Sequence, residues 1–304
     1  MSHPGVAHVP EIGAWIAWWT WDPLVLAGLT AGMALYTHGA RRLWREAGVG
    51  HGIAPWRAAA YGAGIVVIAI ALVSPLDRAS DVLFSAHMVQ HELLMLVAAP
   101  LIVLGRPLVP LAWSLPRGWR VRIARTTSPA RIGRIVTSPV IALGLHVVTR
   151  LVWHVPALFN AALADERLHA IQHLGFFVTA VVFWWALIYG RYGRAGYGVG
   201  VVFVFFTMLY SGLLGAVLSL GDHALYAHAT PTLGWGIDPV ADQQRAGLLM
   251  WVPACVTMMA VGLAIFAAWL GQSARRVGRS PHPSLAGKDA PAPSLPRFTP
   301  EDAP

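Results

Sequence analysis

Two histidines, His87 and His91, lie four residues apart within the long apolar stretch Asp81–Gly105. On a helix, side chains at this spacing project from one face, one turn above the other. Two neutral imidazoles in that arrangement can bind one metal ion or serve as axial ligands of a haem. The alternative is that each histidine makes a polar contact with a neighbouring helix, which is common in membrane bundles.

Four more histidines belong to the same pattern. His169 and His173 repeat the four-residue spacing near the start of a later apolar stretch, and His146 and His154 lie in the stretch before it. If the three stretches are consecutive membrane spans, all six histidines fall in the same half of the membrane, so we predict one shared metal site. We expect His87 and His91 to be the primary ligands, with His169, His173 or His154 completing the site and His146 in a supporting position.

Several other side chains are candidates to complete or support this site. Glu92 and Arg150 are intramembrane charges on adjacent spans, and we expect an ion pair between them or a proton-linked role at the histidine site. Met88 offers a thioether, which suits copper(I), although methionine also fills apolar helix interfaces. Asp242 and Gln243 precede most of the last apolar stretch and are candidates to orient a ligating imidazole through its second nitrogen.

Two histidines near the site region are expected to stay outside it. His223 and His228 lie in the loop before the last apolar stretch, and we interpret them as solvated loop residues, with metal capture at the surface as the alternative. The sequence contains no HExxH motif, GxSxG elbow, Walker loop or Rossmann fingerprint. The chain is therefore expected not to be an enzyme.

The composition places these residues in a membrane protein. Of the 304 residues, 56% are hydrophobic and only 12% are charged, whereas roughly 25% are charged in soluble domains. The fold class expected is an all-α polytopic helical bundle in the lipid bilayer. The single cysteine, Cys255, excludes an internal disulfide and a CxxC metal site.

Hydropathy divides the chain into about seven membrane spans. An outward arm (1–22), whose Trp-rich segment Ile12–Trp21 is expected at the membrane interface, precedes a membrane domain (23–270) and a disordered cytoplasmic tail (271–304). The expected spans are Pro23–Ala40, Pro55–Val73, Asp81–Gly105, Thr137–Val155, Arg167–Ile188, Tyr197–Leu220 and Gln243–Leu270.

The placement of charge predicts the orientation of these spans. Most Lys and Arg residues fall in the loops after the first, third and fifth spans and in the tail, whereas the opposite loops are acidic. Positive residues stay on the cytoplasmic side, so the predicted topology is N-out and C-in. The net charge of +8 is explained by this topology and requires no nucleic-acid partner.

Six segments carry a recognisable pattern. They are SPLD at Ser74–Asp77, LFSAHMVQHELLMLVAAPLIVLGRP at Leu83–Pro107, WHVPALFNAAL at Trp153–Leu163, LHAIQH at Leu168–His173, SGLLGAVLSL at Ser211–Leu220 and DPVADQQRAGLLMWVP at Asp238–Pro253. Together they resemble the CtaG-type cytochrome c oxidase assembly factors over about residues 20–270. The resemblance implies a seven-span protein of the bacterial plasma membrane that is needed to mature haem-copper oxidase. It also implies a connection with copper supply to the CuB centre of subunit I.

Three functions follow from the residues and the resemblance together. The first is an assembly factor that binds copper(I) at the histidines and passes it to subunit I, with a periplasmic copper donor as a further candidate partner. Its binding should weaken as the pH falls through the histidine range, because neutral imidazole is the ligating form. The second is a membrane haem protein with two histidine ligands. The third is a metal-free scaffold that holds the oxidase subunit during insertion.

Overall fold

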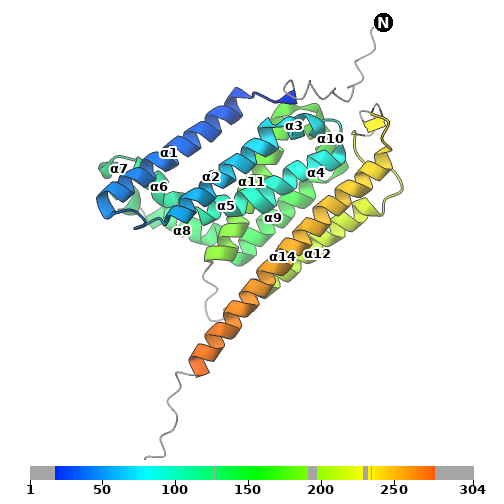
Figure 1. The fold of residues 1–304 in the computed structure, drawn as a ribbon. Helices are drawn as coiled ribbons and strands as arrows, with labels where there is room; N and C mark the ends of the chain where they lie inside the picture. The colour runs from blue at the N-terminus through cyan, green and yellow to red at the C-terminus, as the bar shows by residue number, and fades with distance from the viewer. Residues whose placement is uncertain (1–17, 126, 191–196, 229–231, 234, 278–304) are drawn as a thin grey trace, which may run out of the picture.

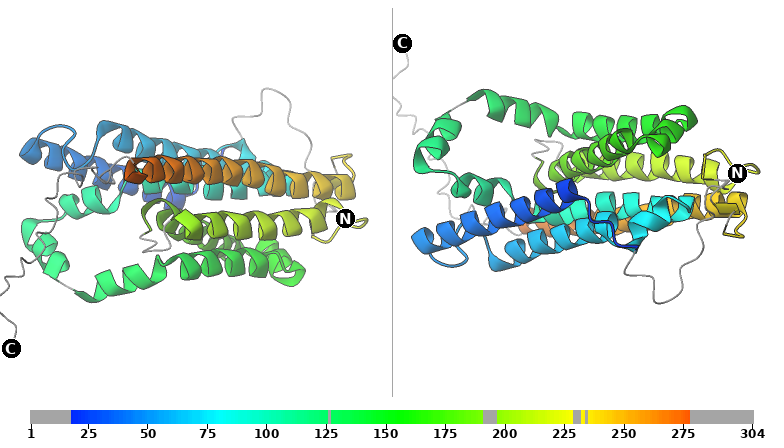
Figure 2. Two further views of the ribbon diagram at one scale, coloured as in Figure 1. Left: turned by 90° about the horizontal axis from the view of Figure 1, so that it is seen from below. Right: turned by 90° about the horizontal axis from the view of Figure 1, so that it is seen from above.

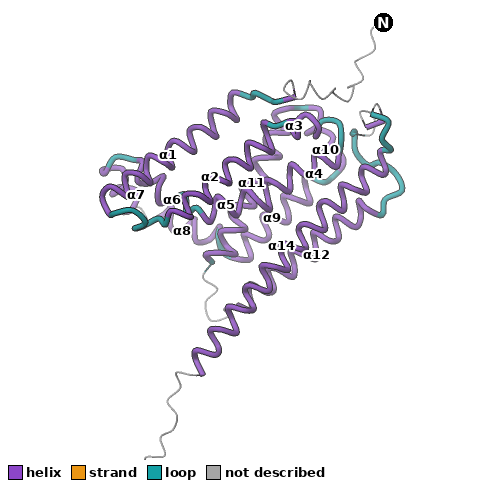
Figure 3. Tube along the Cα trace, in the orientation of Figure 1, coloured by secondary structure: helices purple, strands orange, loops and turns teal. Residues whose placement is uncertain are grey.

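The structure, a computed structural model, describes residues 18–125, 127–190, 197–228, 232–233 and 235–277. These residues form an all-helical bundle, and Figure 3 shows helices and loops but no strand among them. The all-α fold class is therefore confirmed. Most of the arm 1–22 and of the tail 271–304 lies outside the described residues, so the predicted domain division remains a prediction.

The first two long helices, α1 (Pro23–Ala47) and α2 (Pro55–Val73), form a pair at one side of the bundle (Figure 1). Each begins with a proline in its first turn, where no amide donor is needed. The rings of Tyr36 and Tyr61 stack between them with centroids 3.9 Å apart. The Tyr36 hydroxyl also donates to the Gly105 carbonyl at 2.8 Å, which ties this pair to the third span.

The third predicted span is built from several helical pieces. A short helix, α3 (Pro75–Ser80), precedes α4 (Phe84–Glu92), which continues as the π-helical segment η2 (Leu93–Ala98) and then as α5 (Ala99–Leu104). In η2 the Ala99 N–H donates to the carbonyl of Leu94, five residues earlier. Single π turns inside longer helices often accompany functional sites.

A side chain from α11 (Glu166–Tyr189) stabilises the π turn. Pro100 has no N–H to donate, so in this five-residue register the carbonyl of Met95 would lack its partner. The indole N–H of Trp184 donates to that carbonyl at 2.8 Å. Because an unpaired carbonyl inside a membrane is costly, this contact stabilises the π turn directly after the histidines of α4.

Three short helices fill the basic loop that follows the third span. They are α6 (Leu108–Ser114), α7 (Arg117–Arg125) and α8 (Thr127–Val136). From the sequence, only a basic loop is predicted here. These helices lie at the end of the bundle opposite α3 and α10, and we name that end the arginine end (Figure 1).

The fourth span is bent. The chain turns by 74° between α9 (Pro139–Trp153) and α10 (Pro156–Ala164), because Pro156 opens a new helix two residues after His154 ends the old one. The carboxylate of Asp165 then caps α11 (Glu166–Tyr189) by accepting the backbone N–H of Arg167 at 2.7 Å. We name the end that carries α3, α10 and the connection 220–238 the histidine end.

The last two helices, α12 (Tyr197–Ser219) and α14 (Pro239–Val277), run side by side and extend beyond the rest of the bundle at the lower edge of Figure 1. Gly215 and Gly247 allow this close approach. A Cβ on Gly215 would lie 2.6 Å from Cβ of Trp251, and a Cβ on Gly247 would lie 2.7 Å from the carbonyl oxygen of Gly215.

The helices form two layers. Figure 2 shows α1, α2, α4–α5 and α14 in one layer and α9, α11 and α12 in the other. Among the described residues, five helical stretches are long and apolar enough to cross a membrane, and the bent pair α9–α10 would be a sixth. The five stretches are α2, residues 84–104, α11, α12 and α14. The helix α1 is not among them. The count of seven and the N-out orientation remain predictions.

Candidate metal site

Three histidines from the two layers meet at the histidine end. His87 comes from α4, and His169 and His173 come from the first two turns of α11. One ring nitrogen of each lies within 4.8 Å of those of the other two. Because each helix carries its histidines at a four-residue spacing, packing α4 against α11 suffices to bring them together. The structure thus brings these three predicted residues together, whereas their role as metal ligands stays a prediction.

His91 belongs to the same cluster. Its ring centroid lies 4.3 Å from that of His87 and 5.0 Å from that of His173. Two phenyl rings pack closely on the group: Phe159 lies 5.1 Å from His87, and Phe176 lies 4.7 Å from His91. The four imidazoles therefore form one aromatic-walled cluster, which we name the histidine cluster (His87, His91, His169 and His173).

The nitrogens of this cluster have few hydrogen-bond partners. Both ring nitrogens of His87 and His91, and the Nε2 atoms of His169 and His173, are buried without a partner among the described residues. A buried polar group without a partner costs about 1–3 kcal/mol. A cation that accepted these lone pairs would remove that cost at several nitrogens at once.

His228, on the connection between α12 and α14, lies at the site although the sequence pattern did not predict it there. The interpretation of it as solvated is wrong, because the residue is 4% exposed and its ring lies 5.3 Å from that of His87. Its Nε2 lies 2.9 Å from the carbonyl oxygen of Ser80, and its Nδ1 has no partner. Burial lowers the pKa of His228, although Ser80 and Asp242 act in the opposite direction.

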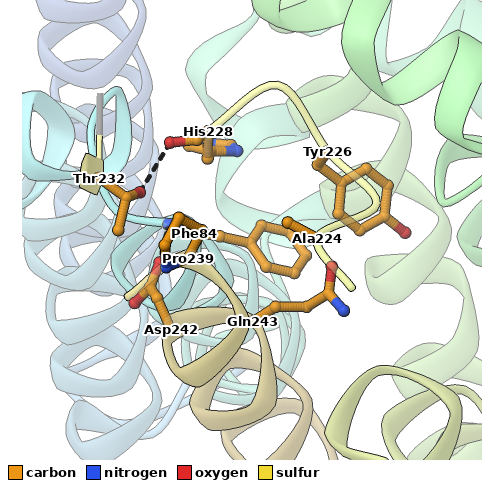
Figure 4. A pocket seen from close by; sticks show the side chains of 8 residues that line it. All are labelled: Phe84, Ala224, Tyr226, His228, Thr232, Pro239, Asp242 and Gln243. Carbon is orange, nitrogen blue, oxygen red and sulfur yellow. Dashed lines mark hydrogen bonds between the residues drawn. The ribbon is translucent and has the colours of Figure 1, made fainter. Parts of the chain in front are cut away.

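The loop that carries His228 is held at several points. Thr232 donates to the carbonyl of Val82 at 2.8 Å, and the Tyr226 hydroxyl donates to the carbonyl of His154 at 3.0 Å. Figure 4 shows His228, Thr232 and Tyr226 around a cavity of only about 10 Å³. By contrast His223 is exposed and pairs with Asp222 at 2.6 Å, so it agrees with the expected solvated loop residue.

His154 and His146 lie farther from the cluster. His154 hydrogen-bonds through Nδ1 to the Arg150 carbonyl at 2.7 Å, and its ring packs against the same Phe159 and Phe176 that contact the cluster. Its Nε2 is buried and unpartnered, so it stays a candidate ligand. His146 lies two helical turns before His154 on α9, and its Nδ1 contacts the Thr179 hydroxyl at 3.2 Å. This position agrees with a supporting role.

The predicted ion pair between Glu92 and Arg150 is confirmed. The Arg150 guanidinium donates to Glu92 Oε1 at 2.8 Å, and the two side chains are 2% and 8% exposed. The ring of Tyr210 lies 5.9 Å from the guanidinium carbon. This pair joins α4 to α9 next to the histidine cluster, so it fixes the position of the helix that carries His87 and His91.

Met88 packs as part of the hydrophobic core. It is fully buried in a cluster with Phe84, Phe159, Leu218 and Met250, on the side of α4 that faces α14. This environment supports the packing alternative raised by the sequence.

Asp242 and Gln243 hold backbone rather than imidazoles. Asp242 accepts the N–H of Phe84 at 2.7 Å and also binds the Ser85 hydroxyl, so it caps the start of α4. Gln243 accepts the N–H of Leu225 at 2.8 Å and donates to the His223 carbonyl at 3.1 Å. The expected contact to a ligating imidazole is replaced by contacts that position α4 and the His228 loop.

The donor set defines what the site can bind. Imidazole nitrogens suit copper, zinc and nickel, with bonds of about 2.0–2.1 Å for zinc. Three nitrogens around such an ion would lie about 3.5 Å apart. Nitrogens already within 4.8 Å of one another reach that separation through small rotations of the side chains.

The fold and the cluster define a polytopic helical membrane protein with buried histidines from separate helices at one point. The chain belongs to the cytochrome c oxidase caa3 assembly factor family (Caa3_CtaG), whose model matches residues 34–272. The resemblance noted in the sequence is thereby confirmed.

Curated relatives are similar over most of the chain. An uncharacterized protein of Mycobacterium leprae is 24% identical over 281 residues, which cover 88% of this chain and 41% of the relative. An uncharacterized protein of Mycobacterium bovis is 24% identical over 287 residues, covering 89% and 42% respectively. The chain thus spans about two fifths of the length of these relatives. No solved structure matches.

Proposed function

We propose that this chain is a non-enzymatic oxidase assembly factor that binds copper(I) at the histidine cluster and transfers it to the CuB centre of subunit I. The observation that carries the proposal is the set of buried, unpartnered nitrogens of His87, His91, His169 and His173 at one point between α4 and α11. Family membership supplies the client, a cytochrome c oxidase. The bound ion is cargo in this proposal.

The ligand roles follow from geometry. His87, His169 and His173 are the primary ligands, since their nitrogens are the closest set. His91 and His228 lie beside His87 and are available as exchange ligands when the ion enters or leaves. Exchange among neighbouring imidazoles lets an ion move without ever losing all its ligands.

The packing favours a small ion over a haem. Two histidines that ligate one haem iron must leave room between them for the whole macrocycle. Five of the six ring pairs in the histidine cluster have centroids 4.3–6.0 Å apart, and Phe159 and Phe176 pack against His87 and His91. A porphyrin would have to displace these phenyl rings, whereas a single ion would not.

The proposal includes a location and an orientation. The acidic connections lie at the histidine end, and the Arg-rich helices α7 and α8 lie at the arginine end. Placing the arginine end in the cytoplasm satisfies the positive-inside rule, so the cluster would face the outer side of a bacterial plasma membrane. A periplasmic copper donor would then meet the chain at the histidine end.

Copper(I) titration of the purified protein against a chromogenic chelator tests the proposal. We expect one tightly held ion per chain, lost in His87→Ala and in His169→Gln, and retained in His223→Ala, a matched exposed histidine at the same end. His169→Gln keeps the helix intact if His87→Ala fails to fold. Equal copper binding by wild-type and both cluster variants would reject the assignment and favour the metal-free scaffold.

A further inference from the structure

A cavity of about 400 Å³ opens beside the histidine cluster. It lies between the segment before α1, α2, α3 and the start of α11, and its apolar part is formed by side chains such as Ile68, Leu72 and Phe177. His169 and His173 also line it, so the cavity reaches two of the three closest histidines.

The rim of this cavity is acidic. The residues that line it include four carboxylates and one cation; these are Asp22, Asp77, Asp81, Glu166 and Arg78. Partial burial raises the pKa of Asp81 to about 6, and the nearby carboxylate of Asp77 contributes to this increase. Arg78 lowers the pKa of Asp81, whereas Glu166 raises it further. The carboxylates therefore repel one another more than Arg78 compensates, and a cation among them would relieve this repulsion.

An unpartnered ligand atom lies at the inner end of the same cavity. His173 is only 9% exposed, and its Nε2 has no hydrogen-bond partner among the described residues. His169 Nε2, one turn earlier on α11, is in the same condition. The cavity thus runs from carboxylate oxygens at the surface to imidazole nitrogens inside.

A second pocket, beside His228, is too small for a hydrated ion. On the side of His228 the cavity volume is only about 10 Å³, and Tyr226 and Thr232 hold the loop over it. The larger cavity therefore offers a hydrated ion room beside the cluster that this smaller pocket does not.

We propose that the 400 Å³ cavity is the loading path of the site, in which Asp81 and Glu166 attract a metal cation and pass it to His169 and His173. This inference rests on the proposed function. The transfer is a ligand exchange, in which water and carboxylate oxygens leave the ion and imidazole nitrogens replace them without a change of oxidation state. The carboxylates act on the rate of loading, whereas the histidines set the affinity.

The test compares loading rates with affinities. Copper(I) is mixed with the purified full chain under anaerobic conditions, and its uptake is followed in time and at equilibrium. Charge-lined clefts raise on-rates by about 10- to 1000-fold, so removing two of the four carboxylates in Asp81→Asn/Glu166→Gln should slow loading by about tenfold. The equilibrium affinity should stay within about twofold, and added salt should slow the wild type more than the variant.

Two controls make the result specific. Asp222→Asn removes a fully exposed carboxylate at the same end, outside the cavity, and should load as the wild type does. In a Cys255→Ser background, Ala170→Cys places a thiol in the cavity wall, and a bulky methanethiosulfonate on it should block loading. The same reagent attached to Ile171→Cys should not block loading, because the side chain of residue 171 does not line the cavity.

The outcomes separate the two proposals. Wild-type loading rates in Asp81→Asn/Glu166→Gln, together with unimpeded loading of the modified Ala170→Cys protein, would overturn the loading path while leaving the copper site intact. Absence of copper uptake by the wild-type chain would overturn the site itself. A variant that loses affinity as well as rate would show that the carboxylates are ligands rather than a path.

Discussion

The carboxylate of Asp242, in the first turn of α14, accepts the backbone N–H of Phe84, the first residue of α4, at 2.7 Å. The two residues are 158 positions apart in the chain. One helix thus caps another, and the capped helix carries His87 and His91. The geometry of the histidine cluster therefore depends on how α14 docks.

Replacing Asp242 by alanine tests this dependence. Two backbone N–H groups and the Ser85 hydroxyl would lose their acceptor, and we expect the protein to lose about 1–3 kcal/mol of stability. Copper affinity should fall as well, because the start of α4 loosens. Thermal unfolding in detergent and copper titration measure the two effects. Asp238→Asn, at the exposed cap of α14 itself, is the matched control, and an equal loss there would contradict the argument.

The buried ion pair gives a second prediction. Glu92→Ala would leave the Arg150 guanidinium buried without its partner, at a cost of about 3–5 kcal/mol. The double variant Glu92→Met/Arg150→Met removes both charges and should recover most of that loss. Unfolding midpoints of the single and double variants measure the loss and the recovery of stability. If the double variant is as unstable as the single one, the pair is not what stabilises this region.

The π turn gives a third prediction. Trp184→Phe keeps an aromatic ring but removes the donor to the Met95 carbonyl, so we expect a loss of about 1–3 kcal/mol. Trp185→Phe, on the adjacent position, should cost less. Pro100→Ala supplies a new N–H near that carbonyl and should partly rescue Trp184→Phe in the double variant. Purely additive losses would argue against the proposed relation between Pro100 and Trp184.

Asp81 gives a prediction about pH. Its pKa is raised to about 6 in the folded protein from an ordinary value of 3.8, so folding takes up a proton between these values. The Asp81 contribution to stability is therefore present below about pH 4 and is lost as the pH rises through 6. Asp81→Asn should stabilise the protein slightly at pH 7 and flatten this part of its pH profile. Unfolding midpoints from pH 4 to 7 measure the difference, and unchanged profiles would contradict the raised pKa.

Hydropathy and spacing predict much of this structure. The helix α2 has the bounds that the apolar pattern predicts, because prolines and polar loops mark its ends. The convergence of His87 with His169 and His173 follows from topology alone, since each pair opens its helix at the same end. The Glu92–Arg150 pair follows from the cost of an unpaired charge in the membrane.

The remaining features depend on contacts that no local pattern contains. His228 is buried because Thr232 reaches Val82 and Tyr226 reaches His154, and these contacts join residues 150 and 72 positions apart. The role of Asp242 likewise depends on a long-range contact to Phe84. The π turn could not be predicted from the sequence, because Pro100 is equally compatible with an ordinary kink in the helix.

The long-range cap at Asp242 also sets an order on biosynthesis. A chain growing from its N-terminus contains His87, His91, His169 and His173 well before it contains Asp242. Until the last helix is made and docked, α4 lacks its cap and the His228 loop lacks the contacts from Gln243. Synthesis of α14 therefore precedes a formed histidine cluster, because a nascent chain without α14 lacks the contacts that position α4 and the His228 loop.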